Sequence, residues 1–125
     1  MIGQQQKDQA EKWFKDLRDK ICEEFEILEE DHLKLDPKSD VAAKKFERKS
    51  TIRETDDKED GGGGVMATLK GGRIFEKVGV NVSAVYGNLA PEAQKSITAR
   101  KDIPELKDDP RFWASGISLV AHMQN

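Results

Sequence analysis

The sequence predicts an α+β fold, in which an N-terminal amphipathic helix packs on an antiparallel β-sheet. Three observations support this prediction: a helical repeat of apolar residues near the N-terminus, an alternating segment after two adjacent glycines, and a second alternating segment at the end of the chain. A chain of 125 residues has the length of one domain and can bury one core. We therefore expect residues 1–125 to lie in a single domain.

The first predicted element is a helix over residues 6–30. Its apolar residues recur at spacings of three and four, which places them on one helical face: Ala10, Phe14, Leu17, Ile21, Phe25 and Leu28. The opposite face is charged, so the helix should lie on the outside of a core. Cys22 lies beside the apolar stripe and next to Glu23 and Glu24. Because no basic neighbour would stabilise a thiolate, we interpret Cys22 as a core residue.

Composition and charge exclude several classes of protein. The 21 Lys and Arg residues against 24 Asp and Glu residues give a net charge of -3, which argues against a nucleic-acid-binding protein. One cysteine and two histidines cannot form an internal disulfide or a structural zinc site. No segment approaches the ~18 consecutive apolar residues of a membrane span, and the first residues lack the apolar stretch of a signal peptide. We expect a cytoplasmic protein without a membrane span.

Residues 31–60 are predicted to form a charged loop. Pro37 interrupts this segment, and charges of both signs alternate along it. A short helix near residues 40–46 is the only regular element expected there. The acidic run 54–60 has no periodic apolar residues, which is typical of a solvated loop. Its spacing does not match a calcium-binding loop.

A β-hairpin is predicted over residues 65–85. Gly71 and Gly72 should supply the positive φ angles of a two-residue turn between its strands. The second strand has one apolar face and one face of small polar residues, which includes Asn81 and Ser83. That polar face could line a ligand pocket or could simply face solvent.

The four glycines before the hairpin, Gly61 to Gly64, resemble a phosphate-binding loop only superficially. Val65 follows them, where a phosphate loop requires Lys-Ser or Lys-Thr. They could serve as a flexible entry to the sheet, or as a place where the backbone approaches a ligand closely.

The last predicted strand covers residues 115–122 and follows a connection with a short helical turn near residues 92–96. Alternation places Ser118 and His122 on one face of this strand. At a rise of about 3.3 Å per residue, their Cα atoms lie roughly 13 Å apart, which excludes a hydrogen-bonded nucleophile pair. Considered alone, His32 and His122 are more typical of structural or surface histidines.

Three blocks of the sequence, taken together, resemble the oxygen-dependent coproporphyrinogen III oxidases. The blocks are Gly61–Met66, Gly72–Ser83 and Asp109–His122, and they occur in the family's order. The predicted first helix, with Trp13 and Phe14, is also similar to the first helix of that family. The resemblance implies a broad antiparallel sheet flanked by helices, of which residues 1–125 would form the N-terminal part.

The resemblance implies an oxidoreductase of haem biosynthesis. Enzymes of this family oxidatively decarboxylate two propionates of coproporphyrinogen III to vinyl groups and so form protoporphyrinogen IX. They use molecular oxygen as co-substrate and no organic cofactor, and they act as homodimers. By the same resemblance, Ser118 matches a substrate-binding serine, and His122 matches a histidine assigned as a ligand of a divalent metal. Whether these enzymes require that metal is disputed.

The resemblance also defines what this chain should lack. The family's proton-donating histidine is expected beyond Asn125, so no catalytic residue is assigned here and the isolated chain is expected to be inactive. Thr51 stands where the family usually has a tryptophan. The last strand should form an unpaired sheet edge with an apolar face, which favours aggregation. The alternative function is a non-enzymatic protein that binds a tetrapyrrole or another anion on the sheet.

Overall fold

The structure is a computed structural model that describes residues 3–55 and 58–125. It confirms the predicted α+β class. Its elements in chain order are helix α1 (Gln4–Leu35), strands β1 (Glu47–Glu54), β2 (Asp60–Lys70) and β3 (Phe75–Asn88), helix α2 (Pro91–Arg100), the 3-10 helix η1 (Pro104–Lys107) and strand β4 (Arg111–Met123).

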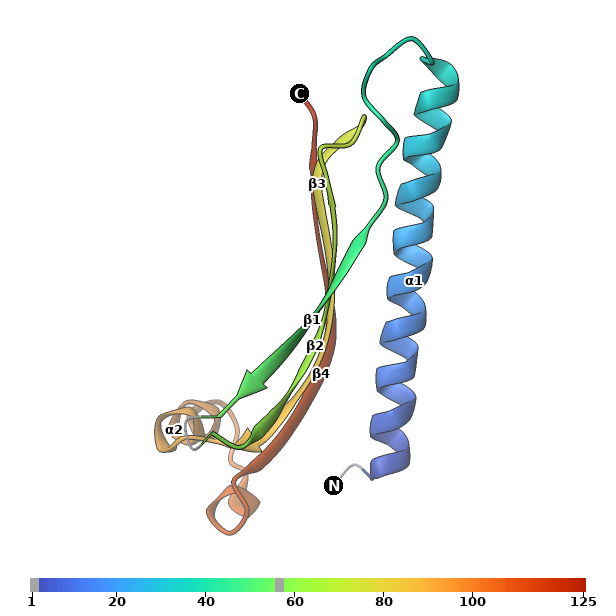
Figure 1. Cartoon of the computed structure of the whole chain (residues 1–125). Coiled ribbons are helices and arrows are strands. Elements are labelled where there is room, and N and C mark those ends of the chain that lie inside the picture. Colours follow the sequence, from blue (N-terminus) through green and yellow to red (C-terminus); the bar gives the residue numbers. More distant parts are fainter. Residues whose placement is uncertain (1–2, 56–57) are drawn as a thin grey trace.

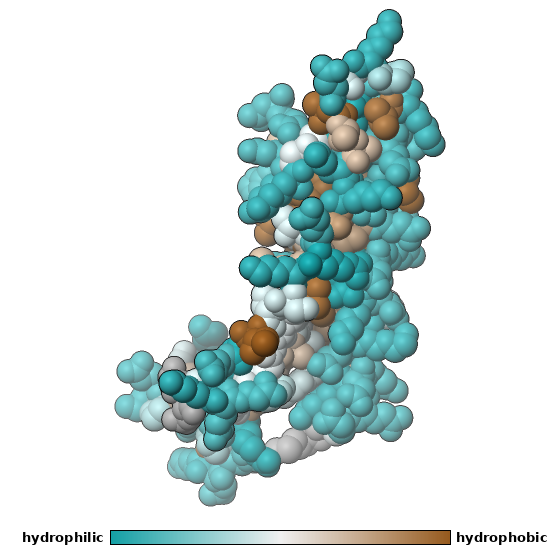
Figure 2. All heavy atoms as spheres, viewed as in Figure 1, coloured by the Kyte–Doolittle hydropathy of each residue, from teal (hydrophilic) through white to brown (hydrophobic). Residues whose placement is uncertain are grey.

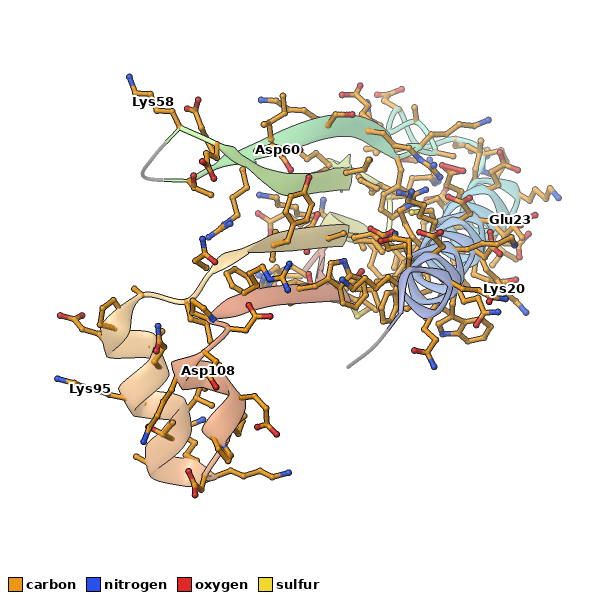
Figure 3. The ribbon with its side chains drawn as sticks, turned by 90° about the horizontal axis from the view of Figure 1, so that it is seen from below. Lys20, Glu23, Lys58, Asp60, Lys95 and Asp108 are labelled. Carbon is orange, nitrogen blue, oxygen red and sulfur yellow. The ribbon has the colours of Figure 1, made fainter. Side chains whose placement is uncertain are left out.

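The four strands form one antiparallel sheet in the order β1-β2-β3-β4. Helix α1 runs along one face of this sheet, while α2 and η1 project from one end of it, away from α1 (Figures 1 and 3). Hydrophilic residues cover most of the visible surface, and many of the hydrophobic ones gather between α1 and the sheet (Figure 2). None of the helices in the described part of the chain combines the length and apolar character that crossing a membrane requires.

Helix α1 extends beyond the predicted range of 6–30 at both ends. At its start, the backbone N–H of Gly3 donates a hydrogen bond to the Gln6 side chain over 2.9 Å. At its end, the backbone N–H of Asp36 donates to the His32 carbonyl, and Pro37 follows, which cannot continue a helix. These local contacts add turns that the apolar periodicity alone does not reveal.

The core lies between α1 and the inner face of the sheet. Leu69, Val78 and Val80 are fully buried there, as the predicted alternation of the second hairpin strand requires. The ring of Phe25 on α1 packs edge-on against Phe75, with ring centroids 4.9 Å apart. Cys22 is buried in the same cluster, which confirms its assignment to the core, and this burial raises the pKa of its thiol.

The prediction of a charged loop over residues 31–60 holds for residues 36–46 but was wrong for residues 31–35 and 47–54. Strand β1 occupies part of this segment, α1 continues to Leu35, and residues 40–46 form no helix. All eight residues of β1 are exposed, so no apolar period marks the strand in the sequence. Backbone pairing with β2 holds it in place, and Arg48 adds an ion pair of 2.7 Å to Asp19 of α1. Residues 56–57 of the predicted loop lie outside the described residues.

The glycine run is part of β2 rather than a flexible entry to the sheet. Gly63 and Gly64 pair with both neighbouring strands. A Cβ on Gly63 would lie 2.1 Å from the Thr51 carbonyl oxygen, and one on Gly64 would lie 2.2 Å from that of Val82. The glycines are therefore needed because adjacent strands approach the β2 backbone too closely for a side chain.

The hairpin between β2 and β3 is confirmed, but its turn is longer than the predicted two residues. A two-residue turn at Gly71 and Gly72 would pair Lys70 with Arg73, whereas Lys70 pairs with Lys77. The cause is Glu29 of α1, a fully buried side chain whose carboxylate accepts hydrogen bonds from the backbone N–H groups of Arg73, Ile74 and Phe75. Of the two turn glycines, only Gly71 has a positive φ, of 63°.

Strand β4 begins at Arg111 rather than Ser115, and α2 is longer than the turn predicted at residues 92–96. As predicted, β4 is an edge strand, since it pairs only with β3 among the described residues. Next to it, an apolar groove of about 520 Å³ separates the strand from α1. The apolar side chains that line this groove are Leu17, Ile21, Phe25, Leu28 and Leu119.

Candidate functional site

Three of the four predicted site residues lie close together on the outer face of the sheet, opposite α1. Asn81 of β3 pairs directly with Ser118 of β4, and His122 pairs with Lys77. Because Val80 and Val82 point into the core, the intervening Asn81 and its partner Ser118 point to the outer face. The prediction that Ser118 and His122 share a face is confirmed, and both side chains are exposed.

A shallow pocket of about 310 Å³ lies on this outer face across β2, β3 and β4. We call it the outer-face pocket. Its lining residues are Met66, Thr68, Lys70, Lys77, Gly79, Asn81, Val120 and His122. The structure thus brings Asn81 and His122 to one pocket, with Ser118 beside Asn81 on the neighbouring strand.

Ser83 does not join this pocket. It lines a separate one, also of about 310 Å³, beside Gly62–Gly64 and Arg18 of α1. Its backbone carbonyl accepts a hydrogen bond of 2.8 Å from the Ser115 hydroxyl. The structure therefore separates Ser83 from the other three candidate residues.

The Asn81 side chain has an oxygen atom without a hydrogen-bond partner. Its Oδ1 is buried and accepts no hydrogen bond in the structure. Such an atom is uncommon in a folded protein, because a buried acceptor that lost its water costs about 1–3 kcal/mol. A donor from a molecule bound in the outer-face pocket would satisfy it.

His122 is a poor metal site on its own. A metal centre needs several donors, and the described residues contain no group of three or more His, Cys, Asp or Glu side chains placed to share an ion. The residue paired with His122 is Lys77, whose ammonium group is a donor and cannot ligate a cation. The residues present do not make a metal centre, so no chemical step is derived through a metal.

A second polar site lies at the other end of the sheet, where β2 begins and β3 ends. The Tyr86 hydroxyl donates a hydrogen bond to the Asp60 carboxylate, which also accepts the backbone N–H of Gly62 over 3.0 Å. The bond from Tyr86 lowers the pKa of Asp60, and the same bond raises the pKa of Tyr86. Both residues line a pocket of about 600 Å³ that also includes Arg111, Phe112 and Trp113.

Comparison with known proteins then identifies the family. Residues 9–125 match the family described as Coproporphyrinogen III oxidase. The chain belongs to this family.

Several curated relatives support the assignment to this family. A protein of Rickettsia felis (strain ATCC VR-1525 / URRWXCal2), named oxygen-dependent coproporphyrinogen-III oxidase, is 43% identical over 119 residues, which are 95% of this chain and 37% of that protein. A protein of the same name from Rickettsia bellii (strain RML369-C) is 38% identical over 124 residues, or 99% of this chain and 39% of that protein. The chain thus spans less than two fifths of the length of these relatives.

Two groups of residues near the candidate site were not predicted from the sequence. Lys70 and Lys77 of the outer-face pocket were not singled out, because the predicted two-residue turn did not pair them. The Asp60–Tyr86 contact was missed because residues 31–60 were expected to form a loop. A correct strand register would have revealed both, since Gly62 pairs with Val85 next to Tyr86.

The Asp60–Tyr86 contact makes a testable prediction for pH titration. Tyr86 is the single tyrosine of the chain, so its ionisation is followed directly by ultraviolet absorbance. We expect it to ionise above its ordinary pKa of 10.0, because the phenolate would lose its hydrogen bond to Asp60 and would face that carboxylate. Asp60→Asn should return the pKa toward 10.0, while Asp109→Asn should leave it unchanged.

The same contact gives the sign of the pH dependence of stability. A raised pKa of Tyr86 stabilises the fold below pH 10.0, and this contribution is lost as the pH rises through the folded pKa. A lowered pKa of Asp60 stabilises the fold above its ordinary value of 3.8, and this contribution is lost as the pH falls through the folded pKa. A Tyr86 titration identical in wild type and Asp60→Asn would contradict the assignment.

Proposed function

We propose that this chain is part of an oxygen-dependent coproporphyrinogen III oxidase and contributes its outer sheet face to the substrate site. The proposed reaction converts two propionates of coproporphyrinogen III to vinyl groups and yields protoporphyrinogen IX. Each conversion removes carbon dioxide, one proton and two electrons from the side chain, and molecular oxygen accepts the electrons. No organic cofactor is included in this proposal.

The observation that supports the proposal best is the placement of Asn81, Ser118 and His122 on one uncovered face, in a chain of this family. Along β4, Ser118 and His122 are separated by about 13 Å at the usual strand rise, which suits a macrocycle better than a small metabolite. Ser118 is proposed to bind the substrate, because its exposed hydroxyl can both donate and accept a hydrogen bond.

Anaerobic titration of the chain with coproporphyrinogen III tests the substrate and the role of Ser118. We expect Ser118→Ala to weaken binding about tenfold, equivalent to about 1.4 kcal/mol, because it removes one hydrogen bond to the ligand. Ser96→Ala on α2 is the matched control, since that serine is exposed at the far end of the sheet. Equal affinities of Ser118→Ala and wild type would exclude Ser118 from the substrate site.

Admission of oxygen to the complex then separates binding from chemistry. No vinyl-bearing product is expected from this chain alone, because none of its residues is assigned as the proton donor. Binding without product in a full-length homologue would support the alternative function, a non-enzymatic protein that binds a tetrapyrrole.

The quaternary structure and the location of the protein are further parts of the proposal. A homodimer is expected from the family, and the apolar groove between α1 and β4 is a surface that an additional element or partner could bury. His122 is kept as a candidate metal ligand, as the resemblance implies, only together with donors that the described residues do not supply. The cytoplasm is the expected compartment. Sedimentation of the whole protein would test the homodimer.

A further inference from the structure

Two lysines lie opposite each other on the outer face without a counter-ion. The sheet register pairs Lys70 of β2 with Lys77 of β3, and Lys77 in turn with His122 of β4. Like charges in directly opposed strand positions destabilise a sheet. In the described part of the chain, neither lysine forms an ion pair. The fold therefore keeps an unfavourable pair that a bound anion would neutralise.

Positive charge is concentrated around this pair, although the whole chain carries a net charge of -3. Both lysines line the outer-face pocket. A second pocket, of about 400 Å³, shares Met66, Thr68 and Lys70 with it. The basic residues that this second pocket adds are Lys44, Lys45, Lys49 and Arg48, of which Arg48 is paired with Asp19 of α1, against one acidic lining residue, Glu47. The electrostatic potential of this surface thus favours a ligand with several negative charges.

The outer-face pocket also offers a hydrogen-bond acceptor beside the ammonium groups of Lys70 and Lys77. The unpartnered Oδ1 of Asn81 lies at the other end of the outer-face pocket from Lys77, four residues along β3. The terminal torsion of an asparagine is broad, so a small rotation can turn this oxygen toward a bound donor. A matching ligand would carry an N–H group at about 10 Å from a carboxylate, given the strand rise of about 3.3 Å and the reach of a lysine side chain.

We propose that Lys70, Lys77 and Asn81 form a ligand subsite in which the two ammonium groups bind a carboxylate and the Asn81 oxygen accepts an N–H donor. This inference rests on the proposed function, because a porphyrinogen carries pyrrole N–H groups inside a ring of propionate side chains. A lysine ammonium is a compact charge without a fixed fork geometry. The subsite therefore holds a flexible propionate without demanding one orientation.

The test is anaerobic binding of coproporphyrinogen III to Lys70→Gln, Lys77→Gln and the double variant. Each single variant should bind about tenfold more weakly, and the double variant should lose most of the dependence of affinity on salt concentration. Lys95→Gln is the matched control, because Lys95 on α2 points into solvent away from the sheet (Figure 3). Its affinity should equal that of wild type.

Two further readouts distinguish binding from a merely structural role. Removing one lysine of the like-charged pair should raise the thermal midpoint slightly while it lowers affinity, whereas a damaged fold would lower both. The methyl ester of the porphyrinogen, which has no carboxylate charge, should bind wild type and Lys77→Gln equally. Asn81→Ala should weaken binding of the acid and of the ester alike, because its partner is an N–H group.

The outcomes separate this inference from the proposed function. If wild type binds the porphyrinogen and Ser118→Ala weakens it, while the lysine variants bind normally, the subsite is wrong and the proposed function stands. If wild type does not bind the porphyrinogen at all, both are wrong for this chain. If the lysine variants lose affinity equally for the acid and its ester, charge recognition is excluded and the subsite is overturned.

Discussion

Gly64→Ala is expected to destabilise the chain by about 3 kcal/mol or more, the upper end of the range for inserting one carbon into a packed structure. The added Cβ would lie 2.2 Å from the Val82 carbonyl oxygen and 2.9 Å from the Ser83 Cα. Both are backbone atoms of β3, so the clash can be relieved only by moving one strand relative to the other. That movement would stretch the hydrogen bonds at the centre of the sheet.

Thermal unfolding followed by circular dichroism measures this effect, and a decrease of the midpoint by about 10 °C is expected for a domain of this size. Gly79→Ala is the matched control. Gly79 lies in β3 of the same sheet, and a Cβ built on it meets no atom within 4 Å, so its stability should change by less than about 0.5 kcal/mol. If the two variants unfold at the same temperature, close strand approach is not the reason for the glycine run.

Glu29→Ala is the second change with a large expected effect, a loss of about 3 to 5 kcal/mol. The Glu29 carboxylate accepts the backbone N–H groups of Arg73, Ile74 and Phe75 over 2.6, 3.0 and 3.1 Å. The side chain is fully buried, so its removal leaves three donors without a partner and a small cavity beside them. Hydrogen bonds to a charged group are among the stronger ones in proteins.

Urea unfolding of Glu29→Ala and of Glu30→Ala compares a buried and an exposed carboxylate one residue apart. Only the first should lower stability strongly. The stability of Glu29→Gln should lie between those of the two alanine variants, because an amide keeps one acceptor oxygen but loses the charge. Hydrogen exchange of the Arg73, Ile74 and Phe75 amides should accelerate in Glu29→Ala. Slow exchange there would show that another group protects them.

The Glu29 contact also explains why the sequence predicted the right hairpin with the wrong register. Gly71 and Gly72 indicate a turn, and this inference is correct. The Glu29 carboxylate, however, accepts the N–H groups of residues 73–75, so these groups do not pair with β2. A Cβ on Gly72 would lie 2.5 Å from Glu29 Oε1. Gly72 is thus needed for room against α1, a contact between residues more than 40 positions apart in the chain.

Strand alternation predicted which face of the sheet the candidate site residues of β4 occupy. Side chains in a strand point to opposite faces with a period of two, so Ser118 and His122 could be assigned to one face without a structure. The lysine pair could not, because pairing across strands depends on the exact turn length. Ser83 has the parity of Asn81, yet the pocket that it lines is a different one, which includes Lys15 and Arg18 of α1.

The sequence by itself determined the elements that carry their own periodicity: α1, β3 and β4 each repeat apolar residues at the spacing of the structure that they form. The family could also be recognised from the sequence, because short blocks of residues resemble it. Only the tertiary structure decided the place of β1 and of the glycine run. Strand β1 is exposed along its length, and the glycines have no side chains, so neither buries apolar surface in a pattern. Their positions follow from backbone hydrogen bonds to neighbouring strands, and such bonds leave no periodic mark in a sequence.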